Sequence, residues 1–267
     1  MKTGKELINE INSKNVLHGH LCFWWLGQHS FIVKTANNVF YLDPYLSEHP
    51  DRCVKSLLKA SEVTNADFIT GSHDHGDHID RDALPGMMKV SAKCRLVIPK
   101  AVWKSLREIG LDETRVIFLD DEKTYKDSGI KITGIKSAHE FFDRDNKEGY
   151  PYLGYIIEAD GVTVYHSGDT CIYDGMASRL KSCDITVAFL PINGRDAKRF
   201  KACCIGNMTY QEAVDLAGAI KPRLTVPSHY EMFAMNMEDP KKFAEYMDVK
   251  YPDLEYWIGE HGVTVSV

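Results

Sequence analysis

The stretch His73-Asp74-His75-Gly76-Asp77-His78 places three imidazoles and two carboxylates in six consecutive positions. These side chains bind borderline divalent metals such as zinc. The preceding residues 66–71 are typical of a short, largely buried strand, so we expect the hexapeptide in the loop that follows a strand end, where active sites of layered α/β folds collect. His73 and His75 can point the same way, whereas Gly76 permits a positive φ that redirects Asp77 and His78. One loop could therefore serve two adjacent metals, and the competing interpretation is surface histidines near a turn.

Composition narrows the class of protein. A chain of 267 residues with 44% hydrophobic residues is large enough for one well-buried globular domain, so we expect a single domain over residues 1–267. The formal net charge of -6 does not favour nucleic-acid binding. Seven scattered cysteines without CxxC spacing indicate free thiols in a reducing compartment. Neither an apolar signal core nor a run of bilayer length is present, and we expect a cytoplasmic, soluble protein without a membrane partner.

Two stretches of the chain resemble each other in outline. Residues 26–34 lead through Asn37-Asn38 into residues 39–43, and residues 153–158 lead through Asp160-Gly161 into residues 162–169. Each pattern predicts a β-hairpin with a tight turn and an aspartate just beyond its second strand. Each is later followed by a further strand that an aspartate opens. An internal duplication explains the likeness economically, and chance similarity of two hairpins is the alternative.

Strand and helix patterns alternate along the chain. Helical periodicity covers about residues 55–60, 100–109, 210–219 and 241–247, and further strand-like runs cover 95–98, 131–135, 224–227 and 254–267. Thr209 and Glu212 have the spacing of a capping box at the start of the third helix. The pattern predicts an α/β protein whose sheets are covered by helices.

Three further metal-binding side chains follow predicted strands. His139 comes after the strand at 131–135, Asp169 after the second hairpin, and His229 after the strand at 224–227. Singly, each has an ordinary explanation as a loop, turn or core residue. Together they supply the ligands that the hexapeptide lacks for a two-metal centre.

In these residues the sequence resembles the metallo-β-lactamase superfamily, whose signature is HxHxDH followed by His, Asp and His after successive strands. The resemblance extends from about residue 24 to the C-terminus and implies a four-layer αββα sandwich of two similar halves. It also implies a first metal held by His73, His75 and His139, and a second by Asp77, His78 and His229. Asp169 would bridge the two metals. Asp43, after the first hairpin, matches the family's buried aspartate, which supports the loop at residues 73–78 (the metal loop) without binding metal.

Within the superfamily, the chain looks most like the L-ascorbate 6-phosphate lactonases. The match is carried by residues 24–27, 73–80, 142–144, 165–169, 193–195, 208–209 and 227–229. It implies hydrolysis of a lactone of a phosphorylated sugar acid, hence an anionic small-molecule substrate. The basic residues Arg195, Lys198, Arg199 and Lys201 could hold its phosphate, although a solvated charged loop is an equal interpretation. The side chains expected to contact substrate are Arg195, Asn193, Arg144 and Tyr230, the last standing where the lactonases carry a second histidine.

The expected mechanism uses a hydroxide that bridges two divalent ions, with Asp77 as metal ligand and as catalytic residue that aims the hydroxide. Zn²⁺ is the expected metal and Mn²⁺ the alternative. Three other functions remain open: a metal-dependent phosphodiesterase or nuclease, a non-hydrolytic diiron redox protein, and a non-catalytic binding module. Redox relatives carry a carboxylate where this chain has His75, and degenerate binding modules lose ligands that this chain keeps. A homo-oligomer is also compatible with the sequence.

Overall fold

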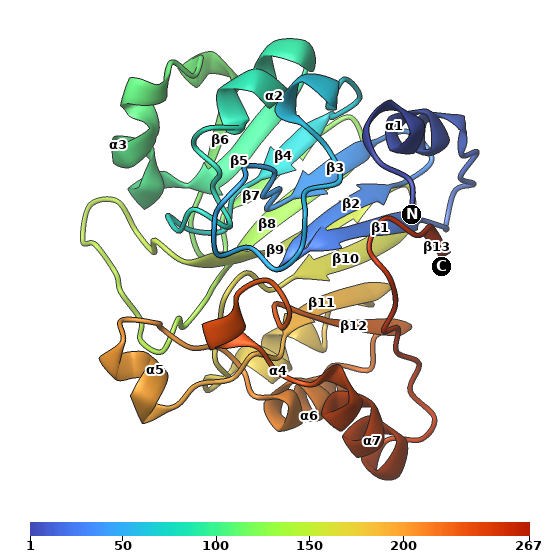
Figure 1. Cartoon of the computed structure of the whole chain (residues 1–267), viewed down its shortest axis with the longest axis vertical. Coiled ribbons are helices and arrows are strands. Elements are labelled where there is room, and N and C mark those ends of the chain that lie inside the picture. Colours follow the sequence, from blue (N-terminus) through green and yellow to red (C-terminus); the bar gives the residue numbers. More distant parts are fainter.

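The computed structural model describes residues 1–267 and contains two mixed β-sheets packed face to face (Figure 1). The seven-stranded sheet has the order β13-β1-β2-β3-β4-β5-β6, and the six-stranded sheet has the order β12-β11-β10-β9-β8-β7. The strands of the first sheet are β1 (Cys22–Gly27), β2 (Ser30–Lys34), β3 (Val39–Leu42), β4 (Phe68–Thr70), β5 (Arg95–Pro99), β6 (Val116–Leu119) and β13 (Val265–Ser266). Those of the second are β7 (Thr124–Asp127), β8 (Ile130–Lys136), β9 (Leu153–Ala159), β10 (Val162–His166), β11 (Val187–Pro191) and β12 (Leu224–Ser228).

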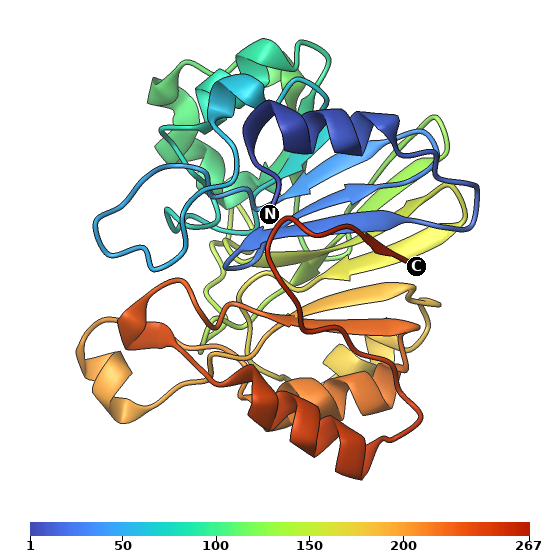
Figure 2. The same cartoon turned by 45° about the vertical axis from the view of Figure 1, so that its right-hand side comes forward.

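Helices cover the outer face of each sheet, which makes four layers (Figures 1 and 2). On the first sheet lie α1 (Gly4–Ser13), α2 (Leu84–Val90) and α3 (Trp103–Leu106), and on the second lie α4 (Met176–Leu180), α6 (Tyr210–Ile220) and α7 (Pro240–Lys250). The short α5 (Ala197–Lys201) lies away from these layers, on the connection between β11 and α6. Single 3-10 turns are η1 (Ala60–Glu62), η2 (Lys100–Val102), η3 (Arg107–Ile109), η4 (Glu113–Arg115) and η5 (Ala234–Asn236). No helix has both the length and the apolar character needed to span a bilayer.

Burial on both faces explains why several strands are continuously apolar. In β1, Phe23 and Trp25 belong to the core between the sheets, whereas Trp24 and Leu26 belong to the core under the first helical layer. Successive side chains of a strand point to opposite faces, and here both faces are covered. The predicted α/β sandwich with two sheets is confirmed.

The two sheets repeat one strand order. In the first, the antiparallel hairpin β2–β3 is followed by the parallel strands β4 and β5; in the second, β9–β10 is followed by the parallel strands β11 and β12. Asp43 directly follows β3, and Asp169 lies in the loop after β10, beyond Ser167 and Gly168. This repetition is what an internal duplication predicts. It brings the loops after β3, β4, β10, β11 and β12 to one end of the sandwich.

Some predicted elements differ from the structure. Residues 55–60 are not a helix, because the chain there is irregular and only η1 follows. The helix predicted over 100–109 is broken into η2, the four-residue α3 and η3, and it ends at Gly110 with φ +79°. Of the strand predicted over 254–267, only Val265–Ser266 forms, after a turn in which Gly262 has φ +69°. The helices over 210–219 and 241–247 and the Thr209–Glu212 capping box are confirmed.

Candidate metal centre

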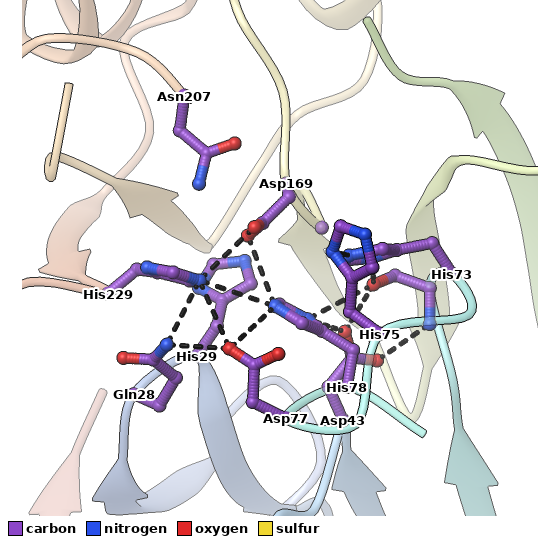
Figure 3. Close-up of polar contacts among 12 residues, drawn as sticks. Gln28, His29, Asp43, His73, His75, Asp77, His78, Asp169, Asn207 and His229 are labelled. Carbon is purple, nitrogen blue, oxygen red and sulfur yellow. Dashed lines mark hydrogen bonds and ion pairs between the residues drawn. The ribbon is translucent and has the colours of Figure 1, made fainter. Parts of the chain in front are cut away.

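All seven predicted metal ligands meet at one end of the sandwich. Figure 3 shows how His73, His75, Asp77, His78, Asp169 and His229 converge. The hexapeptide follows β4, and His139, Asp169 and His229 follow β8, β10 and β12 in turn. Both sheets therefore contribute, so the centre lies between the two halves of the fold. The ligand atoms form three overlapping groups in which all atoms lie within 4.8 Å of one another: His73–His75–His139, His73–His78–Asp169 and Asp77–His78–His229.

The first group consists of three imidazoles that can each offer a free nitrogen. His73 Nε2 lies 2.9 Å from His75 Nδ1, and His139 donates from Nδ1 to the Gly206 carbonyl at 3.0 Å, which leaves its Nε2 as an acceptor. Burial lowers the pKa of His73 and His75, and it lowers the pKa of His139 to about 4. These three side chains are therefore neutral at pH 7, the state in which an imidazole binds metal.

The group Asp77–His78–His229 joins two imidazoles to one carboxylate. His78 Nε2 lies 3.3 Å from His229 Nε2, and each of these nitrogens lies 3.6 Å from Asp77 Oδ2. Burial alone would lower the pKa of both histidines, but the neighbouring carboxylates Asp169 and Asp77 raise the pKa of His229 and hold that of His78 well above its usual range. Without metal, protons therefore supply the positive charge that a divalent ion would otherwise bring.

Asp169 lies between the group His73–His75–His139 and the group Asp77–His78–His229. Its Oδ2 is 3.6 Å from His139 Nε2 and 3.1 Å from His229 Nε2, and its Oδ1 is 3.3 Å from His78 Nε2. Burial alone would raise the pKa of this carboxyl, but His229 and His78 hold it well below its usual range. Oδ1 is buried and accepts no hydrogen bond, which is costly unless another partner takes its lone pair. The position fits a carboxylate that bridges two cations.

Asp43 orients the metal loop from below. It is completely buried, has φ +43°, and its Oδ2 lies 2.7 Å from His78 Nδ1. The same carboxylate accepts hydrogen bonds from the Ser72 amide at 3.0 Å, from Thr70 Oγ1 at 3.1 Å and from Ser72 Oγ. Because Nδ1 of His78 faces Asp43, its Nε2 faces the other ligands. This arrangement is the one expected of a carboxylate that fixes a metal-binding histidine.

Gln28, which no sequence pattern singles out, enters the centre from the turn between β1 and β2. Its Nε2 donates to Asp77 Oδ2 at 2.7 Å and lies 3.2 Å from His229 Nε2, and its carbonyl accepts from the His229 amide at 2.9 Å. The turn needs φ +54° at Gln28. A lone glutamine in a turn carries no sequence signal of metal chemistry, so only the fold reveals this contact.

Two histidines without a predicted ligand role pack against each other beside the ligands. His29 and His166 are fully buried, with ring centroids 4.0 Å apart. His166 Nε2 donates to the His29 carbonyl at 2.8 Å, and His29 Nδ1 lies 2.6 Å from Ser228 Oγ. Burial lowers the pKa of both imidazoles, so they pack as neutral rings.

A cavity of about 400 Å³ opens over the ligands. Besides the ligands His75, Asp77, His139, Asp169 and His229, it is lined by Asp74, Gly76, Cys203, Cys204, Ile205, Phe233, Met235 and Asn236. The four side chains expected to contact substrate lie outside this lining. A substrate role for them stays a prediction, and it requires a substrate that extends beyond the cavity.

Each of the four side chains expected to contact substrate already contacts other residues of the protein. Arg195 is held by both carboxylate oxygens of Glu212, at 2.6 and 2.8 Å, so its guanidinium already has an anionic partner. Asn193 is buried behind the wall of the cavity. Tyr230 packs against Trp25 with ring centroids 5.2 Å apart, and Arg144 lies over the Tyr150 ring at 5.6 Å.

Comparison with known proteins places the chain in a class and then in a family. Residues 38–230 match the family described as the Beta-lactamase superfamily domain, which defines the class. The UPF0173 metal-dependent hydrolase of Thermococcus kodakarensis is 32% identical over 221 residues, which cover 82% of this chain and 88% of the relative. The chain belongs to the UPF0173 metal-dependent hydrolase family.

Two solved structures share the fold. The metallo hydrolase Igni18 of Ignicoccus hospitalis superposes with a TM-score of 0.74 at 23% identity, covering 93% of this chain and 98% of that one. CmlA, a diiron β-hydroxylase of Streptomyces venezuelae, superposes with a TM-score of 0.67 at 14% identity, covering 99% of this chain and 60% of that one. Because hydrolysis and diiron chemistry both occur on this fold, the choice between them depends on the site and the family.

Proposed function

We propose that this member of the family binds two divalent ions and hydrolyses an ester or lactone bond. The observation that carries the proposal is the position of Asp169, which lies within 3.6 Å of His139 on one side and of His78 and His229 on the other. Five imidazoles and two carboxylates converge there, and one carboxylate oxygen has no hydrogen-bond partner. This donor set suits two closely spaced borderline cations.

When bound, two divalent ions would polarise the scissile bond and lower the pKa of the attacking water. The side chains of the protein provide the rest. Asp77 lines the cavity and can accept a hydrogen bond from that water, while Gln28 holds one of its oxygens in place. His73 and His139 present neutral nitrogens from the rigid ends of strands, so little rearrangement is needed on binding.

The donor set favours zinc, with manganese as the alternative, over iron redox chemistry. Diiron redox proteins of the same fold carry a carboxylate where this chain has His75. Here that imidazole lies against His73, with ring centroids 4.5 Å apart. An imidazole-rich first group is well suited to zinc and leaves hydrolysis as the favoured chemistry.

The resemblance to the ascorbate 6-phosphate lactonases favours lactone ring opening, with a lactone of a phosphorylated sugar acid as the specific substrate. A phosphodiester is the second candidate, because the two metals would also suit an in-line displacement at phosphorus. The open cavity of about 400 Å³ admits a small molecule of either kind.

The test is a screen of metal-reconstituted protein against phosphorylated sugar lactones, neutral lactones, simple esters, cyclic nucleotides and phosphodiesters. We expect lactone or ester hydrolysis that is lost on chelation, restored by Zn²⁺ or Mn²⁺, and absent from His75→Ala. Activity on phosphodiesters alone would refute the preference for lactones. Stoichiometric iron with oxidase activity and no hydrolysis would refute the proposed function as a whole.

A further inference from the structure

We propose that the substrate is uncharged next to the scissile bond and carries an aliphatic group that packs on the outer wall of the cavity, where Asn236 donates a hydrogen bond to it. This inference rests on the proposed hydrolysis of an ester or lactone. It names, from the lining of the same site, a substrate class that differs from the phosphorylated lactone favoured by the family resemblance. It concerns the part of the cavity that does not bind metal.

The outer wall is formed by two segments that are distant in sequence. Cys203, Cys204 and Ile205 come from the connection after α5, and Phe233 and Met235 come from the segment after β12 that contains η5 (Figure 2). Met235 has 57% of its surface exposed beside this opening. The cavity therefore has apolar side chains along its outer wall and the predicted metal ligands at its base. Such a cavity suits a molecule with a reactive polar end and an aliphatic remainder.

The wall offers no cation to an anionic substituent. Neither lysine nor arginine lines the cavity. Behind the wall, Arg199 is engaged by Asp196 at 2.6 Å and by the Asn193 carbonyl at 2.5 Å, and Arg195 is engaged by Glu212. A phosphate remote from the metals would displace these pairs or remain without a partner, and burying an unpaired charge is unfavourable.

Asn236 is the polar exception in the wall. Its Oδ1 accepts hydrogen bonds from Asn193 Nδ2 at 2.9 Å and from Arg199 Nη1 at 3.0 Å. These two donors fix the amide, and its Nδ2 has no acceptor within the chain. A neutral N–H donor is thereby held at the cavity, suited to a carbonyl or ether oxygen of the substrate.

The experiment uses zinc-loaded protein and two homologous series: 4-nitrophenyl esters from acetate to octanoate, and γ-lactones from butyrolactone to decalactone. We expect kcat/KM to rise about two- to fourfold for each of the first few added methylenes, as the burial of a methylene predicts. Met235→Ser should flatten this rise. Met237→Ser is the matched control, because Met237 is an exposed methionine of the same segment that does not line the cavity, and it should leave the rise unchanged.

Two variants of Asn236 distinguish a hydrogen bond donated to the substrate from a structural role in holding Arg199. Asn236→Ala should lower kcat/KM about three- to tenfold, the worth of one hydrogen bond between neutral groups. Asn236→Asp keeps an oxygen for Arg199 but replaces the free N–H with an acceptor, so it should lose at least as much. Wild-type kcat/KM in Asn236→Asp would show that the amide only supports Arg199 and would overturn the role of Asn236 as a donor.

The outcomes distinguish the two levels of the proposal. No metal-dependent turnover of any ester or lactone overturns the proposed function. Turnover that is independent of chain length, or equal slopes for Met235→Ser and wild type, overturns the aliphatic wall alone. A higher kcat/KM on a phosphorylated lactone, reduced in a Lys198→Ala/Lys201→Ala double variant, overturns the uncharged substrate and locates the phosphate on α5.

Discussion

Asp43→Asn tests whether the metal loop is braced from the core. Asp43 carries no predicted metal bond, yet its Oδ2 lies 2.7 Å from His78 Nδ1 and its carboxylate also takes the Ser72 amide and hydroxyl. An asparagine of the same size keeps one oxygen and replaces the other with an amide that cannot accept. Either His78 or Ser72 then loses its acceptor, and the His78 ring loses its orientation.

The expected loss of metal affinity is about 10–100-fold, the usual effect of removing the hydrogen-bonded partner of a metal-binding histidine, or roughly 1.4–2.8 kcal/mol. It should be largest for the group Asp77–His78–His229, because Asp43 contacts His78 directly. It should be smaller for the group His73–His75–His139, which Asp43 reaches only through the Ser72 hydroxyl beside His73 Nδ1. Leaving a buried polar group without a partner should also lower the free energy of unfolding by about 1–3 kcal/mol.

Calorimetric zinc titration of the metal-free protein measures both affinities, and denaturant unfolding measures stability. Asp80→Asn is the matched control. That residue is also buried, and its carboxylate accepts hydrogen bonds from the Leu46, Ser47 and Ala83 amides but contacts no predicted ligand. It should cost stability and leave zinc affinity unchanged. Equal zinc affinity for Asp43→Asn and wild type, or equal losses for both variants, would refute the brace.

Three further predictions follow from contacts in the centre. Asp77→Asn should lower kcat by about 10²–10⁴-fold while thermal unfolding stays cooperative, and undiminished turnover would contradict its catalytic role. Gln28→Ala leaves Asp77 Oδ2 without its 2.7 Å donor, so kcat should fall about three- to tenfold with unchanged metal content. The neighbouring carboxylates raise the pKa of His78 and His229, so a metal ion that binds there must displace protons from these imidazoles. Zinc affinity at the group Asp77–His78–His229 should therefore rise with pH, by up to tenfold per pH unit for each displaced proton. The group that contains His139, whose pKa is about 4, should bind with little pH dependence between pH 6 and 8, and equal slopes for both groups in buffered titrations would contradict the assignment.

The metal ligands could be predicted because their chemistry is carried by residue type. Imidazoles and carboxylates after strand ends are visible in the sequence, and the repeated hairpins placed Asp43 and Asp169 just beyond their second strands. Gln28 was missed because its role arises from the packing of the β1–β2 turn against the segment that carries His229. No local pattern reports such a contact between residues 201 positions apart.

Arg195 shows a different limit. Its charge suggested a phosphate site, and Glu212 was seen only as part of a helix cap. In the structure Glu212 has both roles: it caps α6 by accepting from the Thr209 amide, and it binds Arg195.

Local periodicity predicts the wrong element where packing determines the backbone. The buried residues Leu57 and Leu58 lie in irregular chain rather than in the helix predicted over residues 55–60. Conversely, α1 was overlooked although Leu7, Ile8 and Ile11 have helical spacing and are buried.

The dinuclear centre is tested most directly by the content and position of metal in a zinc-loaded crystal, measured by elemental analysis and by anomalous scattering at the zinc edge. We expect two zinc ions per chain. One should lie among His73, His75 and His139, the other among Asp77, His78 and His229, with Asp169 bound to both. One fully occupied ion with no second peak at saturating zinc, or two ions with Asp169 bound to neither, would contradict the dinuclear centre.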